Sequence, residues 1–197
     1  MTDAQTISVY DREANAYAAR FDAGETDRHV GVFMSALPKA AQVLDLGCGP
    51  GRAAAAMQAA GHRVLGIDAS AEMVRLAKAA GVDARCMTFD DMPRLHGPFD
   101  GVWANFSLLH APRAALPDHL AAIAGLMRKD GLFHMGMKTG TGSQRDGIGR
   151  KYTYYDADEL AQLLKDAGFA ELARSTGAET GLDGTRADWV IILSRYA

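Results

Sequence analysis

The stretch Val43–Gly51, which reads VLDLGCGPG, constrains the fold more than any other part of the chain. Its first four residues are apolar except for Asp45, a pattern typical of a buried parallel strand. Glycines lack a Cβ, so those that follow can adopt positive φ and let a ligand lie against bare peptide groups. A helix that begins near Arg52 would point its unpaired N–H groups at the same place. The stretch therefore predicts a strand, a turn and a helix around a nucleotide-like cofactor.

Two kinds of cofactor use such a turn. Dinucleotide-binding domains prefer G-x-G-x-x-G, in which the third glycine packs the helix on the strand. Here Arg52 occupies that third position, and the spacing is G-x-G-x-G after an acid within the strand. A pyrophosphate gains nothing from the Asp45 carboxylate, whereas an ammonium or sulfonium group does. The spacing thus favours a cationic cofactor over a nicotinamide dinucleotide.

The same string resembles the first motif of the class I S-adenosylmethionine-dependent methyltransferases. The resemblance implies S-adenosylmethionine as cofactor, S-adenosylhomocysteine as product, and an enzyme that transfers methyl groups. It also implies an α/β fold, a Rossmann-like three-layer sandwich around a mostly parallel seven-stranded sheet whose last strand is antiparallel. Residues 99–110, 138–155 and 183–189 are further similar to small bacterial methyltransferases that include a tellurite-resistance-like group, which does not name a substrate.

Length and composition limit the possible functions. With 197 residues, 48% of them hydrophobic, the chain is expected to form a single domain with a substantial core. We divide it into an N-terminal helical cap (1–40), a core (41–197) and, within the core, a lid loop (139–155). A formal net charge of −3 offers no basic surface for nucleic acid or an anionic membrane. The two cysteines lack metal spacing and no leader is evident, so we expect a cytoplasmic monomer or homodimer without a metal.

The predicted cap contains two helices. Residues 10–21 carry aromatic and apolar side chains at helical spacing, followed by a stop at 22–24, and residues 27–37 end before a proline. The first helix either packs its aromatic side chains on the sheet edge or closes over cofactor and substrate, as in the family that the chain resembles.

The second predicted strand, 63–68, ends in Asp68, about 20 residues beyond the glycine turn, where a carboxylate accepts hydrogen bonds from both ribose hydroxyls. This acid is not needed as a helix cap, because Ser70 can cap the helix that follows. Met73 in that helix either packs on the adenine, as the resemblance implies, or is a core residue. The predicted cofactor-binding residues are Asp45, Gly47, Cys48, Gly49, Gly51, Asp68, Ala69, Met73, Thr88, Phe89, Asp90 and Asn105.

The third predicted strand, 83–89, leads into an acidic loop. In the family that the chain resembles, an acid that accepts from the adenine amino group often stands where this chain has Thr88. We therefore expect the backbone of Thr88 and Phe89 to take that role, with the Asp90 carboxylate as the alternative.

The fourth predicted strand, 99–105, should bring residues 106–110 to the reactive methyl group, because open parallel sheets bind ligands at the carboxyl ends of their strands. Amino-directed nucleic-acid methyltransferases carry Asn/Asp-Pro-Pro-Tyr/Phe here, whereas this chain reads Ala-Asn-Phe-Ser at 104–107. The difference favours a small-molecule substrate. His110 is either a general base or a structural residue of the loop.

The fifth predicted strand, 131–138, is followed by an irregular stretch, 139–152, with four glycines. A loop of this length is either solvated and mobile or folds over the site as a lid. In the second case Lys138, Arg145 and Arg150 would favour an anionic substrate.

The rest of the chain completes the predicted sheet. Helices are expected within 111–129 and at 156–167. Strands are expected at 169–174 and 188–195, with a polar connection at 176–186. The resemblance implies that the last strand lies antiparallel between the fifth and the sixth.

A sulfonium methyl group is already activated, so the protein need only align the acceptor and exclude water. Orientation alone contributes about 7 to 11 kcal/mol at best. A thiolate, carboxylate or chalcogen anion needs no base, whereas a hydroxyl or ammonium acceptor does, and the candidate catalytic residues are His110, Tyr17 and Tyr152. Two alternatives stay open: a non-catalytic regulator that binds S-adenosylmethionine, and a nicotinamide-dependent oxidoreductase.

Overall fold

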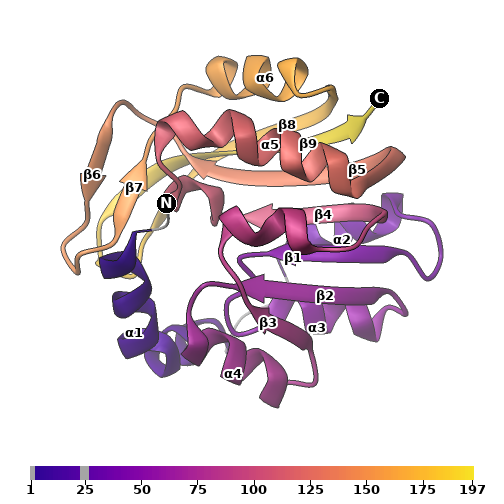
Figure 1. The fold of residues 1–197 in the computed structure, drawn as a ribbon. Coiled ribbons are helices and arrows are strands. Elements are labelled where there is room, and N and C mark those ends of the chain that lie inside the picture. The colour runs from indigo at the N-terminus through magenta and orange to yellow at the C-terminus, as the bar shows by residue number, and fades with distance from the viewer. Residues whose placement is uncertain (1–2, 23–26) are drawn as a thin grey trace.

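The computed structural model describes residues 3–22 and 27–197 (Figure 1). Seven strands form a sheet in the order β3-β2-β1-β4-β5-β9-β8. Strand β9 runs antiparallel to its neighbours β5 and β8, and the other pairs are parallel. This arrangement confirms the predicted Rossmann-like fold and the antiparallel last strand. The strands are β1 (Gln42–Leu46), β2 (Arg63–Asp68), β3 (Asp83–Cys86), β4 (Phe99–Asn105), β5 (Met127–Lys138), β8 (Phe169–Thr180) and β9 (Arg186–Tyr196).

Two helical layers enclose the sheet. Helices α5 and α6 pack on one face, and α2, α3 and α4 pack on the other (Figure 1). Val43 and Leu44 of β1 belong to these two different clusters, as expected for a strand that is buried on both faces. None of the described helices has the length and apolar character of a membrane span. The helices are α1 (Ala4–Asp22), α2 (Arg28–Ala36), α3 (Arg52–Ala59), α4 (Ala71–Ala79), α5 (Leu116–Leu126) and α6 (Ala157–Asp166).

Helix α1 lies at the carboxyl ends of the central strands (Figure 1). It begins at Ala4, earlier than the aromatic pattern predicts, because Asp3 caps it by accepting from the Thr6 N–H at 2.8 Å. The stop predicted at 22–24 extends outside the described residues. The second predicted helix is confirmed as α2.

Tertiary pairing overrides the local pattern in the second half of the chain. Residues 127–129, predicted as the end of a helix, form the start of β5, where Met127 pairs with Phe99 of β4. The polar stretch 176–186, predicted as a connection, is mostly strand, because β8 pairs with β9 as far as Thr180. Polar residues are tolerated there since β8 is the exposed edge of the sheet.

The segment predicted as an irregular loop contains a short hairpin of β6 (Ser143–Arg145) and β7 (Lys151–Thr153). The hairpin lies beside the start of α1 (Figure 1). The Lys151 N–H donates to Thr6 Oγ1 at 2.8 Å, and Arg145 pairs with Asp3 at 2.8 Å. The hairpin is thus fixed to α1 by polar contacts.

Candidate active site

The glycine turn after β1 has the backbone conformation that its sequence predicts. Gly47, Gly49 and Gly51 have φ angles of 78°, 52° and 85°, a region that favours glycine. A Cβ on Gly47 would overlap Ser107, and one on Gly51 would lie 2.9 Å from the Cβ of Ala77. A Cβ on Gly49 would meet nothing within 4 Å. Packing therefore requires two of these glycines, whereas the space beside the Gly49 Cα is open to a ligand.

Asp68, at the end of β2, connects the glycine turn to the start of α4. Its Oδ2 accepts from the Gly49 N–H and its Oδ1 from the Ser70 N–H, both at 2.9 Å. Burial raises the pKa of the Asp68 carboxyl group, and the two donors oppose that rise. Ser70 caps α4 as predicted, accepting from the Met73 N–H at 3.1 Å, and its hydroxyl donates to Asp11 of α1 at 2.6 Å. Asp68 therefore holds the turn in place and also faces the cavity beside it.

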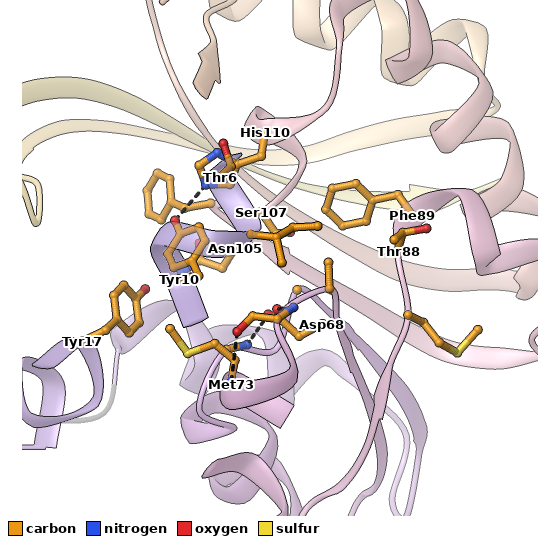
Figure 2. A pocket seen from close by; sticks show the side chains of 17 residues that line it. Thr6, Tyr10, Tyr17, Asp68, Met73, Thr88, Phe89, Asn105, Ser107 and His110 are labelled. Carbon is orange, nitrogen blue, oxygen red and sulfur yellow. Dashed lines mark hydrogen bonds between the residues drawn. The ribbon is translucent and has the colours of Figure 1, made fainter. Parts of the chain in front are cut away.

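A first cavity lies between α1, the glycine turn and the 3-10 helix η1 (Phe89–Arg94) (Figure 2). Most of the predicted cofactor-binding residues line it: Gly47, Gly49, Asp68, Ala69, Met73, Thr88, Phe89 and Asn105. Sequence reasoning missed Thr6, Ile7, Tyr10, Ser70, Met87, Phe106 and Ser107, which line it as well. For α1, helical periodicity and the family resemblance left open whether the helix packs on the sheet edge or covers the site; its residues line the cavity.

Three of the predicted cofactor-binding residues, Thr88, Asp90 and Gly51, either bind another side chain or lie outside the cavity. The Thr88 N–H and hydroxyl both donate to Asp91, at 3.0 and 2.8 Å, which fixes the start of η1. Asp90 is exposed, and its carboxylate lies 4.0 Å from His119. Neither Asp90 nor Gly51 is among the described residues that line this cavity or the second cavity beside it.

A second cavity, of about 400 Å³, adjoins the first and contains Asp45 and Cys48 in its wall. Asp45 is 2% exposed, and its Oδ2 has no hydrogen-bond partner among the described residues. Burial, and then the charge of Asp68, raise the pKa of Asp45 to about 7. Burial also raises the pKa of the Cys48 thiol, which therefore stays protonated. A buried carboxylate with one unpartnered oxygen fits a cationic ligand group better than an anionic one.

Two of the three predicted lid cations line the second cavity. Lys138 Nζ lies 4.1 Å from the centre of the Tyr152 ring, and burial lowers the pKa of Lys138. Arg150 is 3% exposed, and its Nε donates to Asp146 at 2.8 Å. Arg145, in contrast, is exposed, binds Asp3 and does not line either described cavity. The second cavity is thus lined by three cations, Lys138, Arg150 and Arg52, and by three acids, Asp45, Asp27 and Glu179. Of these, Lys138 and Arg150 both lie over the Tyr152 ring.

The candidate bases form an aromatic cluster where the cavities meet. Tyr10 and Tyr17 line both cavities, with their rings 6.0 Å apart. His110, at the end of the 3-10 helix η2 (Leu108–His110), lies 2.8 Å from the Tyr10 hydroxyl (Figure 2). Burial raises the pKa of each tyrosine hydroxyl, including that of Tyr152. The residues described include no group of three or more His, Cys, Asp or Glu arranged to hold a metal ion.

A methyltransferase domain model and several known methyltransferases are similar to this chain. Residues 43–131 match the model of a methyltransferase domain family. The chain is 31% identical over 152 residues to the ubiquinone biosynthesis O-methyltransferase of Thiobacillus denitrificans, covering 71% of this chain and 65% of that protein. It is 39% identical over 98 residues to the trans-aconitate 2-methyltransferase of an Azoarcus species, covering 47% and 36%. The chain thus spans less than two thirds of the length of these curated relatives.

Solved structures extend the likeness to almost the whole chain. The 1,6-didemethyltoxoflavin-N1-methyltransferase of Burkholderia thailandensis, solved with its substrate and S-adenosylhomocysteine, is 26% identical with a TM-score of 0.74. The match covers 97% of this chain and 88% of that one. TehB from Haemophilus influenzae shares the fold with a TM-score of 0.74 at 14% identity, covering 94% of this chain and 67% of that one.

Proposed function

Because the chain belongs to the class I S-adenosylmethionine-dependent methyltransferases, we propose that it transfers a methyl group from that cofactor to an anionic small molecule. The observation that carries this proposal is the pair of adjoining cavities, one lined by Asp68 and one by Lys138 and Arg150. Tyr10, Gly49 and Asn105 line both cavities, which gives cofactor and acceptor a common boundary. Relatives that act on small molecules support the proposal, and the family argues against the nicotinamide alternative.

The residues present fit this cofactor. Asp68, in the first cavity, suits the ribose hydroxyls. The unpartnered Oδ2 of Asp45 suits the ammonium of the methionine part, which would therefore extend into the second cavity beside the acceptor. Met73 and Phe89 line the first cavity and would flank the adenine. The open face of Gly49 would lie against the ligand between them. When bound, the cofactor supplies an electrophilic methyl group on a sulfonium sulfur.

The protein's own contribution is to orient the acceptor and exclude water. Helix α1 covers the first cavity through Thr6, Ile7, Tyr10 and Tyr17. The hairpin contributes to the wall of the second cavity through Tyr152. If an acceptor is held between these walls in line with the carbon–sulfur bond, orientation would supply most of the acceleration of methyl transfer.

Calorimetric titration with S-adenosylmethionine, S-adenosylhomocysteine and NAD tests the cofactor. We expect binding of the first two and none of NAD. Release of S-adenosylhomocysteine can then be measured across carboxylic acids, thiols and chalcogen oxyanions. Cofactor binding without turnover on any acceptor would support the non-catalytic regulator instead, and binding of NAD alone would contradict the proposal.

Replacing Lys138 by methionine tests the anionic substrate. The change keeps much of the side chain's packing on Tyr152 but removes the charge. We expect the KM for an anionic acceptor to rise about tenfold, a typical loss for one charge-assisted contact, with an unchanged S-adenosylhomocysteine Kd. The exposed Lys165 in α6, replaced in the same way, is the matched control. Equal losses of acceptor and cofactor affinity would place Lys138 at the cofactor instead.

The ion pair between Arg145 and Asp3, which joins the hairpin to α1, is expected to slow the dissociation of bound ligands. Arg145 holds the pKa of the Asp3 carboxyl group well below its usual range. Because both side chains are solvent-accessible, Arg145→Ala should speed S-adenosylhomocysteine dissociation by only about two- to fivefold, and high salt should abolish the difference. Stopped-flow measurements can compare it with Arg12→Ala, which removes an exposed pair within α1. If both variants release S-adenosylhomocysteine at the same rate, the contact between the hairpin and α1 does not control ligand release.

A further inference from the structure

We propose that Tyr10 and His110 form a proton relay, in which the Tyr10 hydroxyl contacts the acceptor and His110 receives the proton. This inference rests on the proposed methyl transfer and narrows its substrate. The acceptor would be an anion that also carries an O–H or N–H group, which is the atom that becomes methylated.

The hydrogen bonds of His110 determine its tautomer. Its Nδ1 lies 2.6 Å from the Lys151 carbonyl oxygen, which can only accept, so Nδ1 carries the proton in the neutral ring. Its Nε2 is then an acceptor, and the Tyr10 hydroxyl donates to it at 2.8 Å. The backbone of the hairpin therefore prepares His110 to receive a proton on the side that faces Tyr10.

The Tyr10 oxygen is consequently an acceptor toward the cavities. Its own proton points to His110, and Arg150 Nη1 donates to the oxygen at 3.3 Å. The Tyr10 side chain projects from α1 toward His110 (Figure 2), and Asn105 and Ser107 line the same cavity. Since Tyr10 lines both cavities, a donor group on the acceptor can reach its oxygen beside the cofactor.

Lys138 and Arg150 in the wall of the second cavity connect the pKa of His110 to the binding of an anionic acceptor. Burial is the largest cause that lowers the pKa of His110 to about 4, followed among the lowering causes by Arg150 and Lys138, while the Lys151 carbonyl and Asp146 oppose them. The ring of Tyr152 packs against His110 with centroids 4.8 Å apart. An anion beside Lys138 and Arg150 would cancel the effect of these two cations on the imidazole. His110 would thus become a stronger base only when the acceptor is present.

The step balances without a further reactant. The acceptor atom gives its proton to Tyr10 Oη, and the Tyr10 hydroxyl proton passes to His110 Nε2. The same atom bonds to the methyl carbon as the carbon–sulfur bond breaks, with the bonding pair left on sulfur. The products are the methylated anion, S-adenosylhomocysteine and a protonated His110, which loses its proton to solvent after release.

NMR of protein labelled with ¹⁵N in the imidazole rings, loaded with S-adenosylhomocysteine, tests the relay without a known substrate. The chain has six histidines, so a His110→Gln variant assigns the resonance. We expect a neutral Nδ1–H tautomer at pH 7. Saturating benzoate, which supplies the anion but no transferable proton, should raise the His110 titration midpoint by about one pH unit or more.

Matched variants separate the parts of the proposal. Benzamide, which lacks the charge, should leave the midpoint unchanged, and Lys138→Met should abolish the benzoate response. Tyr10→Phe removes the hydroxyl that donates to His110 and should move the Nε2 resonance of His110. An Nε2–H tautomer, or a midpoint that ignores benzoate, would overturn the relay although the cofactor binds. If the wild-type protein does not bind S-adenosylhomocysteine, this result would instead contradict the proposed function.

Discussion

Replacing Asp68 by alanine is expected to lower the affinity for S-adenosylhomocysteine about 100-fold or more. A carboxylate that accepts from two ribose hydroxyls contributes about 3 to 6 kcal/mol, which corresponds to that loss. The same change removes the acceptor of the Gly49 and Ser70 N–H groups, so the glycine turn should lose order as well. Calorimetric titration gives the Kd, and thermal unfolding without ligand reports the structural part.

The variant Asp68→Asn separates these two roles. An asparagine keeps one acceptor oxygen but places its NH₂ group opposite the other N–H donor, so we expect a smaller loss of Tm than in Asp68→Ala, with weak binding. Asp83→Ala removes an exposed acid from the neighbouring strand β3 and is the matched control. If Asp68→Ala binds S-adenosylhomocysteine as the wild type does, the ribose assignment is wrong.

Replacing Asp45 by asparagine is expected to stabilise the free protein while weakening its affinity for the cofactor. The free carboxylate is buried without a hydrogen-bond partner for Oδ2, so removing its charge should raise Tm by several degrees, about 2 to 4 °C for each kcal/mol. The methionine ammonium loses its counter-charge in the variant, and we expect an affinity loss of about tenfold or more. A rise in Tm together with a fall in affinity distinguishes this result from a general loss of structure, which would lower both.

The pH dependence of both effects follows from the raised pKa of Asp45. Between its unfolded value of 3.8 and its folded value of about 7, the native carboxyl group keeps a proton that the unfolded chain has lost. Stability contributed by this group is therefore present at low pH and is lost as pH rises to about 7. The gain from Asp45→Asn should appear near pH 8 and fade toward pH 4, whereas wild-type affinity for the ammonium should fall below pH 7. A pH-independent affinity would show that Asp45 does not pair with the ligand.

Local sequence was sufficient to predict the part of the site that we propose binds the cofactor. The order of strand, glycine turn and helix at 43–59, the acid Asp68 at the end of β2 and the cap at Ser70 all depend on residues close in sequence. Steric preferences of glycine and the orphan N–H groups of a helix start act over a few residues, so a pattern can predict them. The strand order followed from the family resemblance, which the structure confirms.

Tertiary structure decided the acceptor side. The sequence named His110 but could not show that Tyr10 of α1 donates to it or that the Lys151 carbonyl fixes its tautomer. Nor could it show that Arg145 binds Asp3 while Lys138 faces the second cavity. The extra length of β8 came from pairing with β9, against a polar local sequence. The sequence by itself determined the cofactor turn and its acid, because those depend on backbone preferences over a few residues; the closed site, its charges and its hydrogen bonds depend on segments that meet only when the chain has folded.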